Sequence, residues 1–337
     1  MRTWVVIARR EDAEPVRKAL RNLGVLRKDV RVARSKREVI FPVQTLPEPP
    51  RGHTRTEERD LPTERIAPQS YRELLHLEPD LQALLPRAFD VVGEVVLIRL
   101  PSELESHAAE VGAALLAFVP GARRVGWDQG VRGGARLRHL TAIAGAGAWR
   151  THHRENGLVF VVDPEVAYFS PRLAREHARV AQEVLSGETV WDLCCGIGPF
   201  ALTIARRGTA GRIVAVDSNP DAMTLLRENA ERLGVTARID PRNESVERFL
   251  PSAGAADRVV LNLPHEGIKY LPPVSAAVAP GGTVHYYEVT PRAEYSMRGR
   301  TLLNQLASSP QWTCVGARRV HPFSPHADLV AYTLHRE

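Results

Sequence analysis

Apolar and polar residues alternate with different periods along the chain, and the changes of period divide it into segments. Near the N-terminus, residues 3–8 form an apolar run that predicts a strand. Residues 12–23 have helical spacing behind two acidic residues, and residues 30–42 predict two short strands joined by a turn. We therefore expect a small α/β domain over residues 1–44.

The pattern is lost over residues 45–70. This stretch is rich in proline and charge and poor in large apolar side chains, as linkers are. Patterning resumes at Tyr71 and predicts short strands and a helix over residues 103–118. We expect a flexible linker over 45–70 and a middle α+β domain over 71–160.

Helices and strands alternate regularly over residues 161–337. Helical spacing covers 173–185, 200–207 and 220–233, and apolar runs between these segments predict strands. Strands that alternate with helices form parallel, doubly wound sheets. The expected fold class of this domain is α/β.

A glycine turn follows the first of these strands, in the sequence D-L-C-C-G-I-G-P-F over residues 192–200. Gly196 and Gly198 allow close approach of backbone to a ligand, and Asp217 after the next strand can hold ribose hydroxyls. The glycines also fit a dinucleotide site, or a tight turn without a ligand. Asp192, four residues before Gly196, favours the S-adenosylmethionine (AdoMet) turn of class I methyltransferases.

A second motif, Asn262-Leu263-Pro264, lies at the end of the fourth strand. In an open α/β sheet this end of a strand faces the ligand crevice. An asparagine amide beside a fixed backbone carbonyl can hold the edge of a planar base, as in enzymes that methylate base nitrogens. The alternative for the tripeptide alone is structural, with Pro264 ending the strand.

Together these motifs resemble the archaeal and eukaryotic tRNA guanosine-37 N1-methyltransferases, a family related to the aminocarboxypropyltransferases of the wybutosine pathway. The resemblance is nearly chain-long, and the most specific segment is Y-F-S-P-R with a glutamate four residues after the arginine. The segments that carry it are F-D-V-V-G-E-V-V (89–96), R-L-R-H-L-T-A-I-A-G (136–145), T-H-H-R-E-N-G (151–157), Y-F-S-P-R-L-A-R-E (168–176), D-L-C-C-G-I-G-P-F (192–200), V-D-S-N-P-D-A (216–222), N-L-P (262–264) and G-G-T-V-H-Y-Y-E (281–288).

The resemblance implies a three-part enzyme: a small N-terminal domain that binds the outer corner of tRNA, a middle domain, and a class I (Rossmann-like) methyltransferase domain. It implies that AdoMet is the cofactor, that Glu176 is the general base, that Arg136 is the partner of the guanine, and that Asn262 positions the base. The AdoMet-binding residues it implies are Tyr168, Arg172, Asp192, Gly196, Gly198, Phe200, Asp217, Asn262 and Pro264, with Asn243 or Glu244 at the adenine amine.

The chemistry of the reaction suits these residue types. N1 of guanine bears a proton that must leave as the methyl group is transferred, and a carboxylate such as Glu176 can accept it. Negative charge then moves to O6, where the guanidinium of Arg136 can stabilise it. Outside the matched segment, Glu176 would be interpreted as a solvated residue of a charged helix.

Charge is unevenly distributed along the chain. The net charge is +6, from 45 Lys+Arg and 39 Asp+Glu; residues 1–72 hold 17 Lys+Arg and 10 Asp+Glu, so +7, and the rest hold 28 and 29, so −1. A basic N-terminal segment favours binding of a polyanion such as tRNA, with a steep dependence on salt.

The remaining composition excludes several classes of protein. The apolar runs are shorter than the roughly 18 residues of a membrane span, and the N-terminus does not fit a signal peptide, so we expect a cytoplasmic protein and no membrane partner. Cys194, Cys195 and Cys314 suit neither a disulfide framework nor a metal site. We expect no metal and a monomer.

Three other functions stay open. A relative within the family could transfer the aminocarboxypropyl group of AdoMet, although Asn262-Leu263-Pro264 favours methyl transfer. A recruited relative could act on a small metabolite, and a catalytically silent relative could only bind tRNA.

Overall fold

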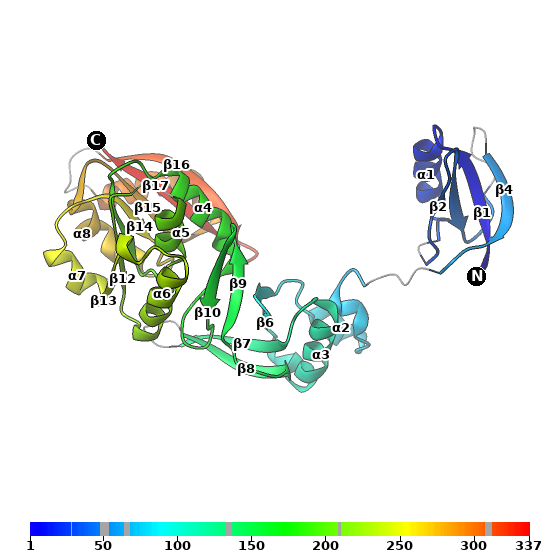
Figure 1. Cartoon of the computed structure of the whole chain (residues 1–337), viewed down its shortest axis with the longest axis horizontal. Coiled ribbons are helices and arrows are strands. Elements are labelled where there is room, and N and C mark those ends of the chain that lie inside the picture. The colour runs from blue at the N-terminus through cyan, green and yellow to red at the C-terminus, as the bar shows by residue number, and fades with distance from the viewer. Residues whose placement is uncertain (28, 48–53, 64–67, 133–136, 208–209, 307–311) are drawn as a thin grey trace. The chain divides into compact units, whose positions relative to one another are not determined.

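The computed structural model describes most of the chain, in two compact units that comprise Met1–Glu73 and Leu74–Glu337 (Figure 1). The described residues are 1–27, 29–47, 54–63, 68–132, 137–207, 210–306 and 312–337. None of the helices in these ranges is both long and apolar enough to cross a membrane.

The first unit is a four-stranded antiparallel sheet in the order β2-β3-β1-β4, with one face covered by helix α1. Val16 and Leu20 of the helix pack on Val6 and Phe41 of the sheet. The elements are β1 (Arg2–Arg9), α1 (Ala13–Asn22), β2 (Ala33–Arg34), β3 (Glu38–Val43) and β4 (Thr54–Asp60).

Strand β4 lies within residues 45–70, where the sequence predicts a linker, so this prediction is wrong for the strand. Its sequence, T-R-T-E-E-R-D, has no large apolar side chain. Backbone pairing with β1, from Arg2 opposite Asp60 to Ala8 opposite Thr54, holds it at the sheet edge. A strand held by backbone pairing and by surface ion pairs such as Arg2–Glu58 and Arg55–Glu38 leaves no period-two apolar pattern for sequence reasoning to find.

The second unit begins with a smaller sheet in the order β5-β6-β7-β8, followed by the hairpin β9-β10. Helix α3 packs against β8 and β7. The elements are α2 (Pro79–Leu84), β5 (Asp90–Val92), β6 (Val95–Ile98), α3 (Ala108–Phe118), β7 (Arg124–Arg132), β8 (Leu137–Gly145), β9 (Thr151–Glu155) and β10 (Leu158–Val162).

The larger sheet of this unit has seven strands in the order β13-β12-β11-β14-β15-β17-β16. Its strands are β11 (Thr189–Leu193), β12 (Arg212–Asp217), β13 (Ile239–Asn243), β14 (Ala256–Leu261), β15 (Val278–Pro291), β16 (Trp312–Pro322) and β17 (Ala327–Arg336). Its helices are α4 (Ala174–Glu183), α5 (Pro199–Arg207), α6 (Pro220–Arg232), α7 (Val246–Phe249), α8 (Leu271–Ala276) and α9 (Tyr295–Gln305).

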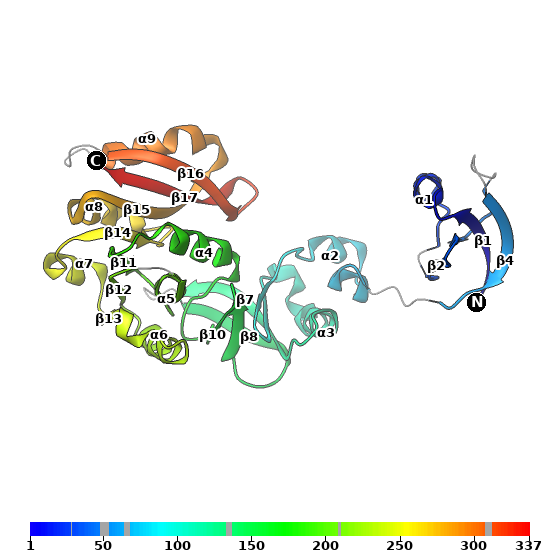
Figure 2. The same cartoon turned by 45° about the horizontal axis from the view of Figure 1, so that its top comes forward.

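Apolar layers cover both faces of this sheet. Successive side chains of a strand point to opposite faces, so Val190 joins the layer with α4, α5 and α6, and Trp191 and Leu193 join the layer with α7, α8 and α9. Figure 2 shows helices on either side of the strands. The α/β architecture expected from the alternation of elements is confirmed.

The sheet is mixed rather than wholly parallel. Strands β11 to β15 pair in parallel, but β17 lies antiparallel between β15 and β16. The expectation of parallel strands therefore holds for the strands that follow helices, including β16 after α9, and fails for β17, which pairs with β16. These two strands follow each other through a short turn, which joins antiparallel strands.

Candidate active site

A cavity opens at the point where the strand order of the large sheet reverses. From β11 the chain proceeds outward to β12 and β13, and from β14 it proceeds to the opposite side. Ligands of open α/β sheets bind at such a reversal, beyond the carboxyl ends of the strands. Here the cavity measures about 870 Å³, which is large enough for a nucleotide-sized ligand.

The glycine turn after β11 has left-handed backbone at three of its residues. The φ angles are 60° at Cys194, 56° at Gly196 and 79° at Gly198. A Cβ atom at Gly198 would lie 2.7 Å from Cδ1 of Leu226, so both space and conformation require glycine there. Gly196 lines the cavity, whereas Gly198 faces Leu226 and supports the turn from behind.

Asp192 lies at the end of β11 and lines the cavity, with 1% of its surface exposed. Its Oδ2 accepts a hydrogen bond from the backbone N–H of Ala201 at 3.0 Å, and its Oδ1 has no partner among the described residues. Burial raises the pKa of this carboxyl to about 7, against the effect of the Ala201 hydrogen bond, and the negative charge of Asp217 adds to the rise.

Asp217 lies at the end of β12 and joins the turn to the next helix. Its Oδ2 accepts from the N–H of Gly196 at 2.8 Å and its Oδ1 from the N–H of Asn219 at 2.9 Å. Burial raises the pKa of Asp217, although both hydrogen bonds oppose the rise. Each carboxylate oxygen can accept a further hydrogen bond, so the pair can still bind hydroxyl groups.

Most of the residues that the sequence predicts for the site meet at this cavity. Asn262 and Pro264 follow β14, and the carbonyl oxygen of Pro264 accepts a hydrogen bond from the N–H of Val289 at 3.2 Å, which ties this end of the strand to β15. The predicted residues that line the cavity are Tyr168, Arg172, Asp192, Gly196, Phe200, Asp217, Asn262 and Pro264.

The two candidates for the adenine contact differ in position. Glu244 lines the cavity, but Asn243 does not. The Nδ2 of Asn243 instead donates to the backbone carbonyl of Asp217 at 3.0 Å. Asn243 therefore supports the end of β12, and Glu244 is the residue whose position suits a ligand contact.

An ion-pair cluster from the smaller sheet forms another wall of the cavity. Nε of Arg172 donates to Oδ1 of Asp90 at 2.7 Å, and Nη2 of Arg138 lies 3.6 Å from the other oxygen of Asp90. Arg138 also donates to buried Asp128 and lies over the ring of Tyr168, 5.1 Å from its centroid. Arg136, which the sequence predicts as the partner of guanine, lies outside the described residues.

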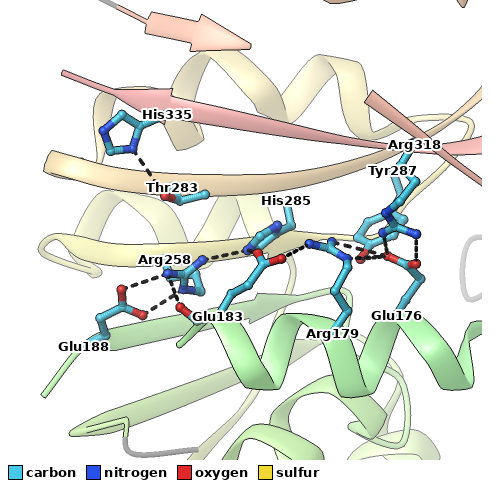
Figure 3. Close-up of polar contacts among 10 residues, drawn as sticks. All are labelled: Glu176, Arg179, Glu183, Glu188, Arg258, Thr283, His285, Tyr287, Arg318 and His335. Carbon is cyan, nitrogen blue, oxygen red and sulfur yellow. Dashed lines mark hydrogen bonds and ion pairs between the residues drawn. The ribbon is translucent and has the colours of Figure 1, made fainter. Parts of the chain in front are cut away.

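Glu176, the predicted general base, does not line the cavity. Its carboxylate is 2% exposed and is held by Arg318 through both oxygens, by the hydroxyl of Tyr287 at 3.2 Å and by Nε of Arg179 at 3.3 Å (Figure 3). Burial raises the pKa of Glu176, but the hydrogen bond from Arg318 and the charges of both arginines outweigh it, and the pKa is lowered.

Sequence reasoning missed His177, which follows Glu176 on α4 and lines the cavity. Its Nδ1 lies 2.6 Å from Oε1 of Glu155, and its Nε2 has no partner in the part of the chain that the structure describes. A single histidine within a charged helix gives no signal of this pairing, because Glu155 is 22 residues away.

The C-terminal turn between β16 and β17 forms another part of the cavity wall. Here His321, Pro322, Phe323 and Pro325 line the cavity. The ring of Phe323 lies 5.3 Å from that of His265, just after the Asn262-Leu263-Pro264 motif. An aromatic face beside this motif is the kind of surface on which a planar base stacks.

The strand order, the glycine turn and Asp217 after the second strand define a Rossmann-like methyltransferase. Residues 151–313 match the TRM5/TYW2 methyltransferase domain, and residues 71–148 match the TYW2 N-terminal domain. The tRNA (guanine(37)-N(1))-methyltransferase Trm5b of Pyrococcus abyssi is 31% identical over 95% of this chain and 95% of its own. The chain belongs to the TRM5/TYW2 methyltransferase family, as a Trm5-type tRNA guanine-N1 methyltransferase.

The chain is also similar to a solved structure of a family member and to a relative named for a different activity. A crystal structure of wild-type Trm5b from Pyrococcus abyssi has a TM-score of 0.80 to this chain, at 29% identity over 99% of each chain. The tRNA(Phe) (4-demethylwyosine(37)-C(7)) aminocarboxypropyltransferase of Pyrococcus horikoshii is 29% identical over 68% of this chain and 81% of its own. The resemblance stated from the sequence is thus confirmed.

Proposed function

We propose that this enzyme methylates N1 of guanosine 37 in tRNA, with AdoMet as methyl donor. The observation that carries the proposal is that one cavity joins the glycine turn to Asn262 and Pro264. A cofactor at the turn and a base at the tripeptide would therefore share one space. The basic segment at the N-terminus supports tRNA as the polyanion that brings this base, and tRNA modification suits the expected cytoplasmic location.

The residues present fit AdoMet. Asp217 can bind the ribose hydroxyls, and the buried Oδ1 of Asp192 has no partner within the described part of the chain. A Cβ atom at Gly196 would lie 3.3 Å from the carbonyl oxygen of Tyr168. Tyr168, Arg172 and Phe200 line the same space. Bound AdoMet would supply an electrophilic methyl group.

The protein's own residues prepare the guanine. Asn262 would hold the edge of the base through its amide, and Phe323 would offer a face for stacking. Glu176 would take the proton from N1, and Arg136 would stabilise the negative charge that develops on O6. Arg138, two residues further along the same segment, lies in the cavity wall, where it is paired with Asp128 and Asp90.

Transfer of the labelled groups of AdoMet tests the reaction. The protein is incubated with unmodified tRNA transcripts and with AdoMet labelled on the methyl group or on the aminobutyrate chain. We expect methyl label in tRNA that carries G37 and none in a G37→A transcript. Aminobutyrate label in tRNA would identify an aminocarboxypropyltransferase, and the absence of both labels would refute action on tRNA.

Substitution of Glu176 tests its role as base. Glu176→Gln should lower the single-turnover methylation rate by about 10²–10⁴-fold, since the amide cannot accept the proton. The affinity for AdoMet should stay within about twofold, because Glu176 lies outside the cavity wall.

His177→Gln is the matched variant, since His177 is the neighbouring group that could accept a proton at the cavity. It should retain most of the rate if Glu176 is the base. A large loss for His177→Gln together with a small loss for Glu176→Gln would transfer the role to the His177–Glu155 pair. Thermal unfolding of both variants shows that any loss is not a loss of fold.

A further inference from the structure

Three side chains hold the carboxylate of Glu176 by hydrogen bonds and ion pairs. Arg318 bridges both of its oxygens, and Tyr287 and Arg179 bind the same group (Figure 3). The carboxylate is 2% exposed, whereas the side chain of Arg318 is 43% exposed. A ligand from solution can therefore reach the arginine but not the glutamate.

Arg318 lies on a strand that also forms part of the cavity wall. Strand β16 is the edge strand of the large sheet, and its pairing with β17 shifts register between Cys314 and Gly316 and between Arg319 and His321. Such irregularities bend a strand and interrupt its ladder. His321 and Phe323 line the cavity, so an RNA chain that brings a base to them would run along the strand that carries Arg318.

The chemistry of Arg318 suits this RNA chain. The described part of β16, Trp312–Pro322, carries Arg318 and Arg319 and no acidic residue. Arginine binds phosphate and carboxylate through the same two-pronged geometry, so the two groups compete for it. Arg319 is paired with Asp328 at 2.9 Å, and this pair does not involve Glu176.

We propose that Arg318 contacts the tRNA backbone, and that in the RNA-free enzyme Glu176 binds Arg318 in place of the RNA. A phosphate near the target nucleotide takes Arg318 from Glu176, and the freed carboxylate becomes able to accept a proton. The inference rests on the proposed function for its substrate and for the role of Glu176. Departure of Arg318, which contacts both oxygens, would also uncover the carboxylate for the incoming base, while Tyr287 and Arg179 stay bound to it.

Release of the hydrogen bond from Arg318 also makes the carboxylate of Glu176 more basic. Burial is the largest influence on the pKa of this carboxyl and raises it, and the hydrogen bond from Arg318 is the next and lowers it. Removal of that bond leaves burial less opposed, so the pKa rises. A carboxylate with a raised pKa is a better proton acceptor at neutral pH.

Binding of tRNA to four variants of the full-length protein tests the proposal. If tRNA must break the Arg318–Glu176 pair, Glu176→Gln should bind unmodified tRNA about three- to tenfold more tightly than wild type, because the arginine is already released. The gain should disappear in the double variant Glu176→Gln/Arg318→Gln. It should persist in Glu176→Gln/Arg319→Gln, which removes an equal charge from the same strand.

Glu183→Gln controls for charge, since it removes a carboxylate from the same helix and the same ion-pair chain without touching Arg318 (Figure 3). Glu176→Asp keeps the charge but draws the carboxylate back by one methylene from Arg318, so it should also tighten binding in an Arg318-dependent way. It provides the same test should Glu176→Gln fail to fold.

Two results would overturn the proposal: tRNA affinity of Glu176→Gln equal to that of Glu183→Gln, or a gain that survives Arg318→Gln. Failure of the proposed function has a different signature. Full methyl transfer by Glu176→Gln would remove Glu176 as the base, whatever the binding comparison shows about Arg318.

Discussion

The cofactor end of the cavity and the wall formed by charged side chains are built in different ways. At the cofactor end, backbone amides of Gly196, Asn219 and Ala201 hold two carboxylates, and the turn has left-handed backbone. At the opposite wall, arginines hold carboxylates through ion pairs, as Arg138 holds Asp128 and Arg172 holds Asp90. Backbone amides stay fixed on ligand binding, whereas arginines can exchange a carboxylate for a phosphate.

This difference suits the two substrates that the proposed reaction requires. AdoMet is small and uniform, and a rigid site can be shaped to it. A tRNA is a large polyanion whose phosphates can compete for the exposed arginines near the cavity.

The largest effect is expected at the charged wall. Arg138→Gln removes the buried partner of Asp128 and should lower the free energy of unfolding by about 3–5 kcal/mol, since a buried carboxylate is left uncompensated. Arg99→Gln removes a second arginine near the same oxygen, but its side chain is 67% exposed, so the loss should be below about 1 kcal/mol. Urea unfolding measures both, and equal losses would contradict the distinction.

The next largest effect concerns the cofactor end, where the ionisation of Asp192 makes the free energy of unfolding depend on pH. Burial raises the pKa of Asp192 from 3.8 to about 7, so between these values the folded protein binds a proton that the unfolded chain does not. The free energy of unfolding therefore falls as pH rises through this window, and the loss is complete above it. Asp192→Asn does not titrate.

The stability of Asp192→Asn relative to wild type should consequently rise with pH. Between pH 4 and pH 8.5 we expect a relative gain of up to about 4 kcal/mol in cofactor-free protein. Urea unfolding at both pH values is the measurement. A difference between the two proteins that does not change with pH would show that Asp192 ionises in the folded state as it does in the unfolded chain.

The smallest effect concerns the basic N-terminal unit. Lys36 and Arg37 are exposed in the turn between β2 and β3. Their replacement by Gln should weaken tRNA binding severalfold and reduce the slope of log K against log salt by about 1–2, as expected for two lost phosphate contacts. Arg300→Gln on α9 is the matched exposed control. AdoMet affinity should be unchanged in all variants, and an unchanged salt slope would argue against RNA contact at this turn.

Local patterns made the cofactor end predictable from the sequence. Asp192, Gly196 and Asp217 belong to strand–turn–helix motifs whose members are close in sequence, so spacing alone places them at one sheet edge. The position of Glu176 could not be predicted in this way. Its main partner, Arg318, is 142 residues distant, on an edge strand whose irregular register has no simple sequence pattern.

The large sheet of the second unit cannot be completed until strand β17, near the C-terminus, has been synthesised. Although it comes last among the strands, it lies inside the sheet between β15 and β16. A nascent chain that has not yet reached Ala327–Arg336 leaves the pairing edges of both neighbours open, and open edges invite association with other chains. The N-terminal unit, complete within its first 73 residues, can fold long before the ribosome has supplied the strand that the catalytic sheet still lacks.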